Sequence, residues 1–162
     1  MTLNQIDYKI IDLLQRNARM TQSEIAASVG LSQPAVAERM KKLEQEGVIT
    51  GYAARVDSRK LGKDITAFIG VSIEHPKYNN EFSRLMLLHK DVLECHRVTG
   101  ADSYLLKVVT ENTESLDRLI SDTVRVAPGV TRTLTTIVMS SVKESTYVKP
   151  AGGEQKTPKK RR

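Results

Sequence analysis

The sequence predicts an α+β protein with two folded domains, and three features of its 162 residues lead to this class. Apolar residues recur at helical spacing in most of residues 1–56, whereas strand-like alternation and helical spacing take turns in residues 64–148. The polar stretch at 57–63, which contains Gly62, is expected to be a linker between them. Residues 149–162 cannot bury a core and are expected to form a disordered basic tail.

The first helix is expected to begin at Asn4 or Gln5 and to end at Arg16. Apolar residues recur along it every three or four positions, which is the spacing of a helix with one buried face. This stripe consists of Ile6, Ile10, Leu13 and Leu14.

The segment that follows predicts two short helices joined by a glycine turn. Thr21 and Glu24 form a capping box, which marks the start of the first of these helices. Gly30 ends it, since glycine accepts the left-handed conformation that a C-cap needs, and Ser32 caps the next helix, which Gly47 ends. Helix, short turn and helix is the helix-turn-helix arrangement, whose second helix enters the major groove of DNA.

The second of these helices has one apolar stripe and one polar face. Val36, Met40 and Leu43 recur at i, i+4 and i+7 and are expected to face the core. The polar face carries side chains that can hydrogen-bond to DNA: Arg pairs well with guanine, Gln pairs well with adenine, and Glu accepts a hydrogen bond from cytosine. Lys more often contacts the phosphates. The residues expected to contact DNA are Ser32, Gln33, Ala35, Glu38, Arg39, Lys41 and Lys42. The alternative is an ordinary helical hairpin whose charged face is merely solvated.

A β segment is expected at residues 48–56, which include Ile49, Tyr52 and Val56. A short strand or hairpin after a recognition helix forms the wing of a winged helix-turn-helix domain. Arg55 is expected to reach a backbone phosphate from this wing.

The second domain is expected to have the ferredoxin-like fold. Alternating apolar residues predict strands and helical spacing predicts helices, in the order βαββαβ. The strands are expected at 65–73, 92–99, 104–110 and 130–142. The helices are expected at 80–89 and from 113 or 114 to 126. In this fold two helices cover one face of a four-stranded antiparallel sheet. Because the other face also carries Ile, Val and Leu, we expect a second copy of the chain to cover it in a symmetric dimer.

The net charge of +6 is unevenly distributed, because residues 149–162 hold six Lys or Arg against one Glu. Most of the basicity therefore lies in the tail, where it adds salt-sensitive affinity for phosphate. A signal peptide is not evident, and apolar runs are too short to cross a bilayer, so a cytoplasmic protein without membrane contact is expected. The single cysteine, Cys95, fits a reducing compartment.

An enzyme is the main alternative class, and the sequence argues against it. His75, His89 and His96 do not have metal-ligand spacing, and a phosphate-binding glycine loop is not found. Cys95 and His96 are neighbours on an expected strand, so their side chains point to opposite faces and cannot pair. We therefore expect neither catalysis nor a cofactor or metal site.

Several motifs, in order along the chain, are similar to those of the Lrp/AsnC (feast/famine) family of prokaryotic transcription regulators. They are Leu3-x-x-Ile6-Asp7, Gly30-Leu31-Ser32, Gly47-Val48-Ile49, Val98-Thr99-Gly100, Tyr104-Leu105-Leu106 and Pro128-Gly129-Val130. The resemblance implies a regulator that binds double-stranded DNA and assembles into dimers and higher oligomers such as octamers. It also implies that the second domain senses an amino acid or a related metabolite at an interface between dimers.

The resemblance implies an effector site at Gly100, Asp102, Tyr104, Thr133 and Thr135. The family's loop usually reads Gly-x-x-Asp-Tyr, whereas here Ser103 precedes Tyr104 and the acidic residue comes one position earlier. Two alternatives stay open: these residues only shape a turn and a strand pair, or the protein is an architectural DNA-wrapping protein of the same fold without effector sensing.

Overall fold

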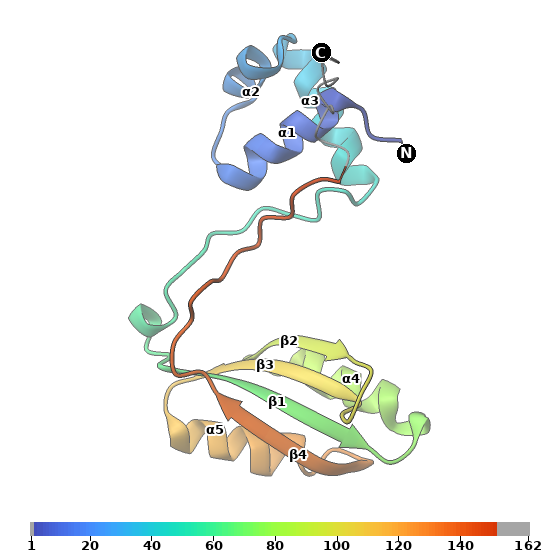
Figure 1. The fold of residues 1–162 in the computed structure, drawn as a ribbon, viewed down its shortest axis with the longest axis vertical. Helices are drawn as coiled ribbons and strands as arrows, with labels where there is room; N and C mark the ends of the chain where they lie inside the picture. Colours follow the sequence, from blue (N-terminus) through green and yellow to red (C-terminus); the bar gives the residue numbers. More distant parts are fainter. Residues whose placement is uncertain (1, 152–162) are drawn as a thin grey trace, which may run out of the picture. The chain divides into compact units, whose positions relative to one another are not determined.

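The structure is a computed structural model that describes residues 2–151, and Figure 1 shows its elements. The chain forms two compact units, of which one contains the residues up to Arg55 and those from Lys143 onward. The other comprises Val56–Val142. The residues just after Val142, which we had expected in the second domain, therefore pack with the N-terminal helices. Most of the expected tail, residues 152–162, lies outside the described residues.

Within the described residues, the first unit contains three helices: α1 (Gln5–Arg16), α2 (Gln22–Val29) and α3 (Gln33–Gln45). All three begin where the sequence predicted, and Thr21 and Glu24 form the predicted capping box. Gly30 ends α2 with a φ of 72°, in the left-handed region that favours glycine. The buried core contains the predicted apolar residues Ile10, Leu14, Ile25, Val36 and Leu43.

The second unit is a four-stranded antiparallel sheet with helices against one face. Its main elements are β1 (Ile65–Ile73), α4 (Asn79–Leu88), β2 (Val92–Arg97), β3 (Tyr104–Thr110), α5 (Thr113–Leu119) and β4 (Val130–Ile137). Short helical turns lie at Arg59–Leu61, Pro76–Tyr78 and Ile120–Val124. The sheet order is β2-β3-β1-β4, and Phe82 of α4 and Leu116 of α5 pack with Ile69 of the sheet in one core. The predicted ferredoxin-like fold is confirmed.

Three of the expected strands differ from the structure, and one of them is β2, which ends at Arg97 and not at residue 99. The segment 48–56 contains no strand, because among the described residues its backbone has no partner strand in the ladder. The last strand ends at Ile137 and not at residue 142. Among the described residues its neighbour is β1, where Ala67 pairs with Ile137 and the Val138 N–H still donates to the Thr66 carbonyl at 2.9 Å, so residues 140–142 run past the start of the partner at Ile65.

The faces of β2 also differ from the simple alternation. The pairing with β3 shifts register between Val92 and Glu94, which is the mark of a β-bulge. Consequently Val92 and Cys95 both pack against the helix-covered core, although residues three positions apart on a regular strand point to opposite faces.

The face of the sheet opposite the helices is open and partly apolar, as the sequence predicted. Phe68, Leu105 and Leu134 lie on the three adjacent strands β1, β3 and β4 and are 37%, 36% and 57% exposed. Lys107, which lies opposite Phe68 in the β1–β3 register, forms an ion pair with Glu94 of β2. Among the helices that the structure describes, none has the length and apolar character to cross a membrane.

Candidate DNA-binding surface and effector pockets

Helix α3 presents a polar surface. Its N-cap Ser32 accepts a hydrogen bond from the backbone N–H of Ala35 at 3.4 Å, and Pro34 lies in the first turn, where its missing N–H is not needed. Val36 and Leu43 are fully buried. Five of the predicted contact residues are exposed and Ala35 is half-buried; the exposed ones are Ser32, Gln33, Glu38, Lys41 and Lys42.

Arg39, the seventh predicted contact residue on this helix, is engaged inside the unit. Its Nη1 lies 2.8 Å from Oδ1 of Asp7, whose side chain is buried at the start of α1. The other oxygen of that carboxylate accepts the backbone N–H of Asn4 at 2.9 Å and closes the capping box of α1. Arg39 therefore neutralises a buried charge, and its reading of a base stays a prediction that this contact disfavours.

Arg55 lies in the extended segment after α3, where the sequence predicted a wing. Its Nη2 donates a hydrogen bond to the backbone carbonyl of Glu144 at 2.9 Å, while the residue itself is exposed. This carbonyl accepts from only one of the guanidinium's nitrogens, which leaves other N–H donors of Arg55 for a phosphate. The phosphate contact of Arg55 therefore stays a prediction.

The predicted effector residue Asp102 lies on the open side of the sheet. Its Oδ1 accepts hydrogen bonds from Arg132 at 2.9 Å and from the hydroxyl of Ser72 at 3.3 Å. Gly70 makes room for the carboxylate, because a Cβ there would lie 2.3 Å from Asp102 Oδ2. The carboxylate is thus already neutralised within the chain. Gly100, in the same loop, has a φ of 131° and is exposed.

Tyr104 lies on the opposite, helix-covered side. Its ring is buried against Phe82 with the centroids 4.8 Å apart. Its hydroxyl lies 3.2 Å from the Ser83 hydroxyl and 3.4 Å from the carbonyl oxygen of Asn79. Tyr104 therefore closes the core beside α4 and also lines a pocket of about 730 Å³ between α4 and β2.

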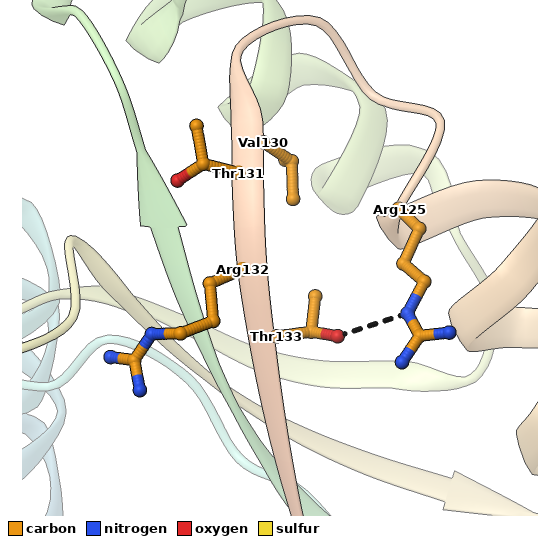
Figure 2. A pocket seen from close by; sticks show the side chains of 5 residues that line it. All are labelled: Arg125, Val130, Thr131, Arg132 and Thr133. Atoms are coloured by element: carbon orange, nitrogen blue, oxygen red, sulfur yellow. Dashed lines mark hydrogen bonds between the residues drawn. The ribbon is translucent and has the colours of Figure 1, made fainter.

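Thr133 and Thr135 lie on the edge strand β4, where they pair with Val71 and Ile69 of β1. Figure 2 shows a second pocket, of about 380 Å³, in which Arg125 Nε donates to Thr133 Oγ1 at 3.2 Å. Its walls are Arg125, Val130, Thr131, Arg132 and Thr133. Sequence reasoning missed Arg125, because only the fold brings the end of a helix against β4.

The five predicted effector residues do not converge within one chain. Tyr104 and Thr133 line different pockets, and β1 separates their strands. Asp102 lies in the loop between β2 and β3, where it contacts the open side of the sheet. A single site containing all five would have to form between copies of the chain.

Comparisons with known proteins cover both units. The family model described as Lrp/AsnC ligand binding domain matches residues 66–148, and the one described as winged helix-turn-helix DNA-binding matches residues 3–50. The chain is 42% identical to the HTH-type transcriptional regulator YezC of Bacillus subtilis over 139 residues, which cover 86% of this chain and 96% of that one. It is 37% identical to the proline dehydrogenase transcriptional activator of Rhizobium radiobacter, with 88% and 93% covered.

A solved structure with the same fold is the transcriptional regulator–L-Met complex from Neisseria meningitidis. It superimposes with a TM-score of 0.85 at 30% identity, over 91% of this chain and 96% of that one. The exposed recognition helix, the fold and these matches define a DNA-binding transcription regulator with a ligand-binding domain. More specifically, the chain belongs to the Lrp/AsnC family.

Proposed function

We propose that this protein is an amino-acid-responsive, sequence-specific transcription regulator that acts as a homo-oligomer in the cytoplasm. The single observation that carries the DNA-reading part is the exposed polar surface of α3, above a stripe that is fully buried at Val36 and Leu43. In a dimer two such helices enter successive major grooves, about 34–36 Å apart, so the operator is a near-palindrome.

The exposed residues of α3 divide into two roles. Gln33 and Glu38 lie in its first two turns and suit base edges, together with Ser32 and Ala35 at its start. Lys41 and Lys42 follow one turn later and suit phosphates, as Arg55 does beyond the helix. The protein therefore combines base contacts, which select the site, with phosphate contacts, which add affinity for any duplex.

Binding measurements on the selected operator and on random DNA test this division. Glu38→Ala should relax selectivity at one base pair and cost roughly 1–3 kcal/mol on the operator. Lys42→Ala should weaken both DNAs alike and reduce the salt slope by about 1. The control is Glu46→Ala, just beyond α3, which should leave selectivity unchanged. Equal loss on both DNAs for Glu38→Ala would contradict its base-reading role.

The effector part of the proposal rests on the pocket beside β4. A guanidinium and a hydroxyl, from Arg125 and Thr133, line it together (Figure 2), and this pair suits the carboxylate of an amino acid. The related Neisseria protein was solved with L-Met. We infer that Thr135, two residues further along the same face of β4, extends the site within one chain, and that Gly100, Asp102 and Tyr104 complete it from a neighbouring copy of the chain. The bound amino acid then shifts the assembly equilibrium in proportion to its preference for one state.

Calorimetric titration with single amino acids, followed by sedimentation with and without the best binder, tests the effector. Arg125→Ala should weaken binding at least tenfold, since it removes a charge-assisted hydrogen bond. Arg118→Ala, which removes an exposed arginine of α5, is the control. A protein that binds no amino acid yet still compacts DNA would instead be the architectural protein. The neutralised carboxylate of Asp102 favours that second candidate.

A further inference from the structure

The chain passes between its two units twice (Figure 1). The first passage follows Arg55 and the second precedes Lys143, because the first unit contains residues from both parts of the sequence. Units joined by a single flexible passage are expected to turn relative to each other. A second passage limits this turning only while the residues beyond it stay attached to the first unit. We call these residues, 144–150, the C-terminal strap.

One side chain of α1 holds the backbone of the strap. Gln15 Nε2 donates to the Val148 carbonyl at 3.0 Å, and the Val148 N–H donates to Gln15 Oε1 at 2.7 Å. Because one amide group both donates to and accepts from the same residue, it fixes which residue of the strap lies against α1.

Tyr147 is a second anchor, one residue before Val148. Its hydroxyl donates to Oδ1 of Asp12. The guanidinium of Arg16 lies 5.3 Å from the centre of the Tyr147 ring and pairs with the same Asp12 at 2.9 Å. Two neighbouring residues of the strap are therefore bound by one exposed edge of α1.

The two passages are also joined to each other. Arg55, the residue before the first passage, donates from Nη2 to the carbonyl of Glu144 at 2.9 Å. At the other end of the strap, Pro150 and Tyr52 line a pocket of about 830 Å³ in the same unit. The strap thus contacts both α1 and the segment that leads into the first passage.

The contacts of the strap lie at the surface, so its docking is reversible. The Val148 side chain is 72% exposed, and the anchors are polar. The apolar core of this unit, as far as the structure describes it, comes from residues 3–49. Release of the strap therefore removes polar contacts and leaves the packing of the three helices intact.

We propose that Gln15 and Tyr147 are positioning residues that set which spacing of half-sites the protein accepts. This inference rests on the proposed operator binding by two copies of α3. While the strap is docked, two passages restrain each DNA-binding unit, and its recognition helix has fewer orientations available. Half-sites that match these orientations are bound by both helices at once. For mismatched half-sites this gain is lost, because the geometry forbids simultaneous engagement.

Binding to three duplexes tests the proposal. The half-site is the sequence that the full chain selects from random DNA. Two duplexes carry two inverted copies of it, with centres about 10 bp apart or about 5 bp further, so that the second pair faces opposite sides of the helix. The third carries one copy. The ratio of the affinities for the first two duplexes is the phase preference, which should be on the order of tenfold or more for the full chain.

Two variants release the strap from opposite sides. Gln15→Ala combined with Tyr147→Ala removes the anchoring side chains, and Val148→Pro removes the N–H that donates to Gln15. Each should lower the phase preference on the order of threefold while leaving the affinity for the single half-site unchanged. The control is Gln45→Ala, the same change at an exposed glutamine that ends α3, which should keep the full preference.

The phase preference and the single half-site together decide the outcome. An unchanged phase preference in both variants would overturn the proposal while leaving DNA reading by α3 intact. A loss that is equal on all three duplexes would also overturn it, because the strap would then only support the fold of the helices. Failure of the full chain to distinguish the selected half-site from random DNA would instead contradict the proposed function itself.

Discussion

The ion pair with Asp7 determines the role of Arg39, the arginine of the recognition helix α3. Successive residues are offset by 100° around a helix, so Arg39 lies at the flank of the buried stripe and not at the centre of the outward face. Its guanidinium neutralises a carboxylate that is 1% exposed. Since an unpaired buried charge is costly, Arg39→Ala should lower the free energy of unfolding by roughly 3 kcal/mol.

Denaturant unfolding of Arg39→Ala, alone and combined with Asp7→Asn, checks this prediction. The second substitution removes the stranded charge while keeping an oxygen for the Asn4 N–H, so the double variant should regain part of the loss. A stable Arg39→Ala protein that has lost selectivity at one base would instead support the base-reading role first predicted.

Tyr52 is a second residue whose environment makes a testable prediction. Its partial burial, and then its hydrogen bond to Glu44 Oε1 at 2.9 Å, raise the pKa of its hydroxyl to about 12. The pKa in the unfolded chain is about 10. Because the folded-state pKa is the higher one, this group's contribution to stability is complete below pH 10 and is lost as the pH rises towards 12.

Ultraviolet titration of the phenols should therefore show a late-titrating tyrosine that disappears in Tyr52→Phe. Tyr147 also titrates late, because its hydrogen bond to Asp12 raises its pKa, so Tyr147→Phe is the matched comparison. Tyr52→Phe should also flatten the fall in stability above pH 10. A complete titration of every phenol near pH 10 would contradict the Tyr52–Glu44 contact.

At the scale of elements, the sequence predicted what depends on local pattern and missed what depends on distant partners. The capping residues and apolar stripe of α3 are local, so its bounds and its exposed face followed from residues 32–47. The β-bulge in β2 depends on its register with β3, and alternation alone could not place it. Segment 48–56 has strand-like residues, but a strand also needs a neighbour in the ladder.

The candidate sites divide in the same way. The residues of α3 that we predict to contact DNA lie in one continuous segment, so the local sequence pattern was enough to propose them. Arg125 and Thr133 meet only through the packing of a helix end against β4, and Asp7 meets Arg39 across 32 positions of sequence. Such pairs have no periodic signal, because any spacing along the chain can bring two residues together in the fold.

For the whole molecule, we expect the open face of the sheet to govern assembly. Phe68, Leu105 and Leu134 are side chains that a soluble monomer would leave in water, and Leu134 is the most exposed of them. A symmetric dimer would bury them against the same residues of a second copy. Leu134→Arg should place the arginines of the two copies near one another in this dimer contact. It should shift the protein to monomers, since desolvating unpaired charges is unfavourable.

Sedimentation equilibrium over a hundredfold range of concentration measures the shift. The control is Val126→Arg, an equally drastic change at a residue that is 68% exposed but lies outside the sheet, between the last helical turn and β4. This variant should keep the wild-type assembly. Because two recognition helices are needed to span two half-sites, the monomeric Leu134→Arg variant should also lose affinity for the full operator while keeping its affinity for a single half-site. An unchanged oligomer in Leu134→Arg would mean that the sheet face is not the dimer contact, and the open apolar surface would need another partner.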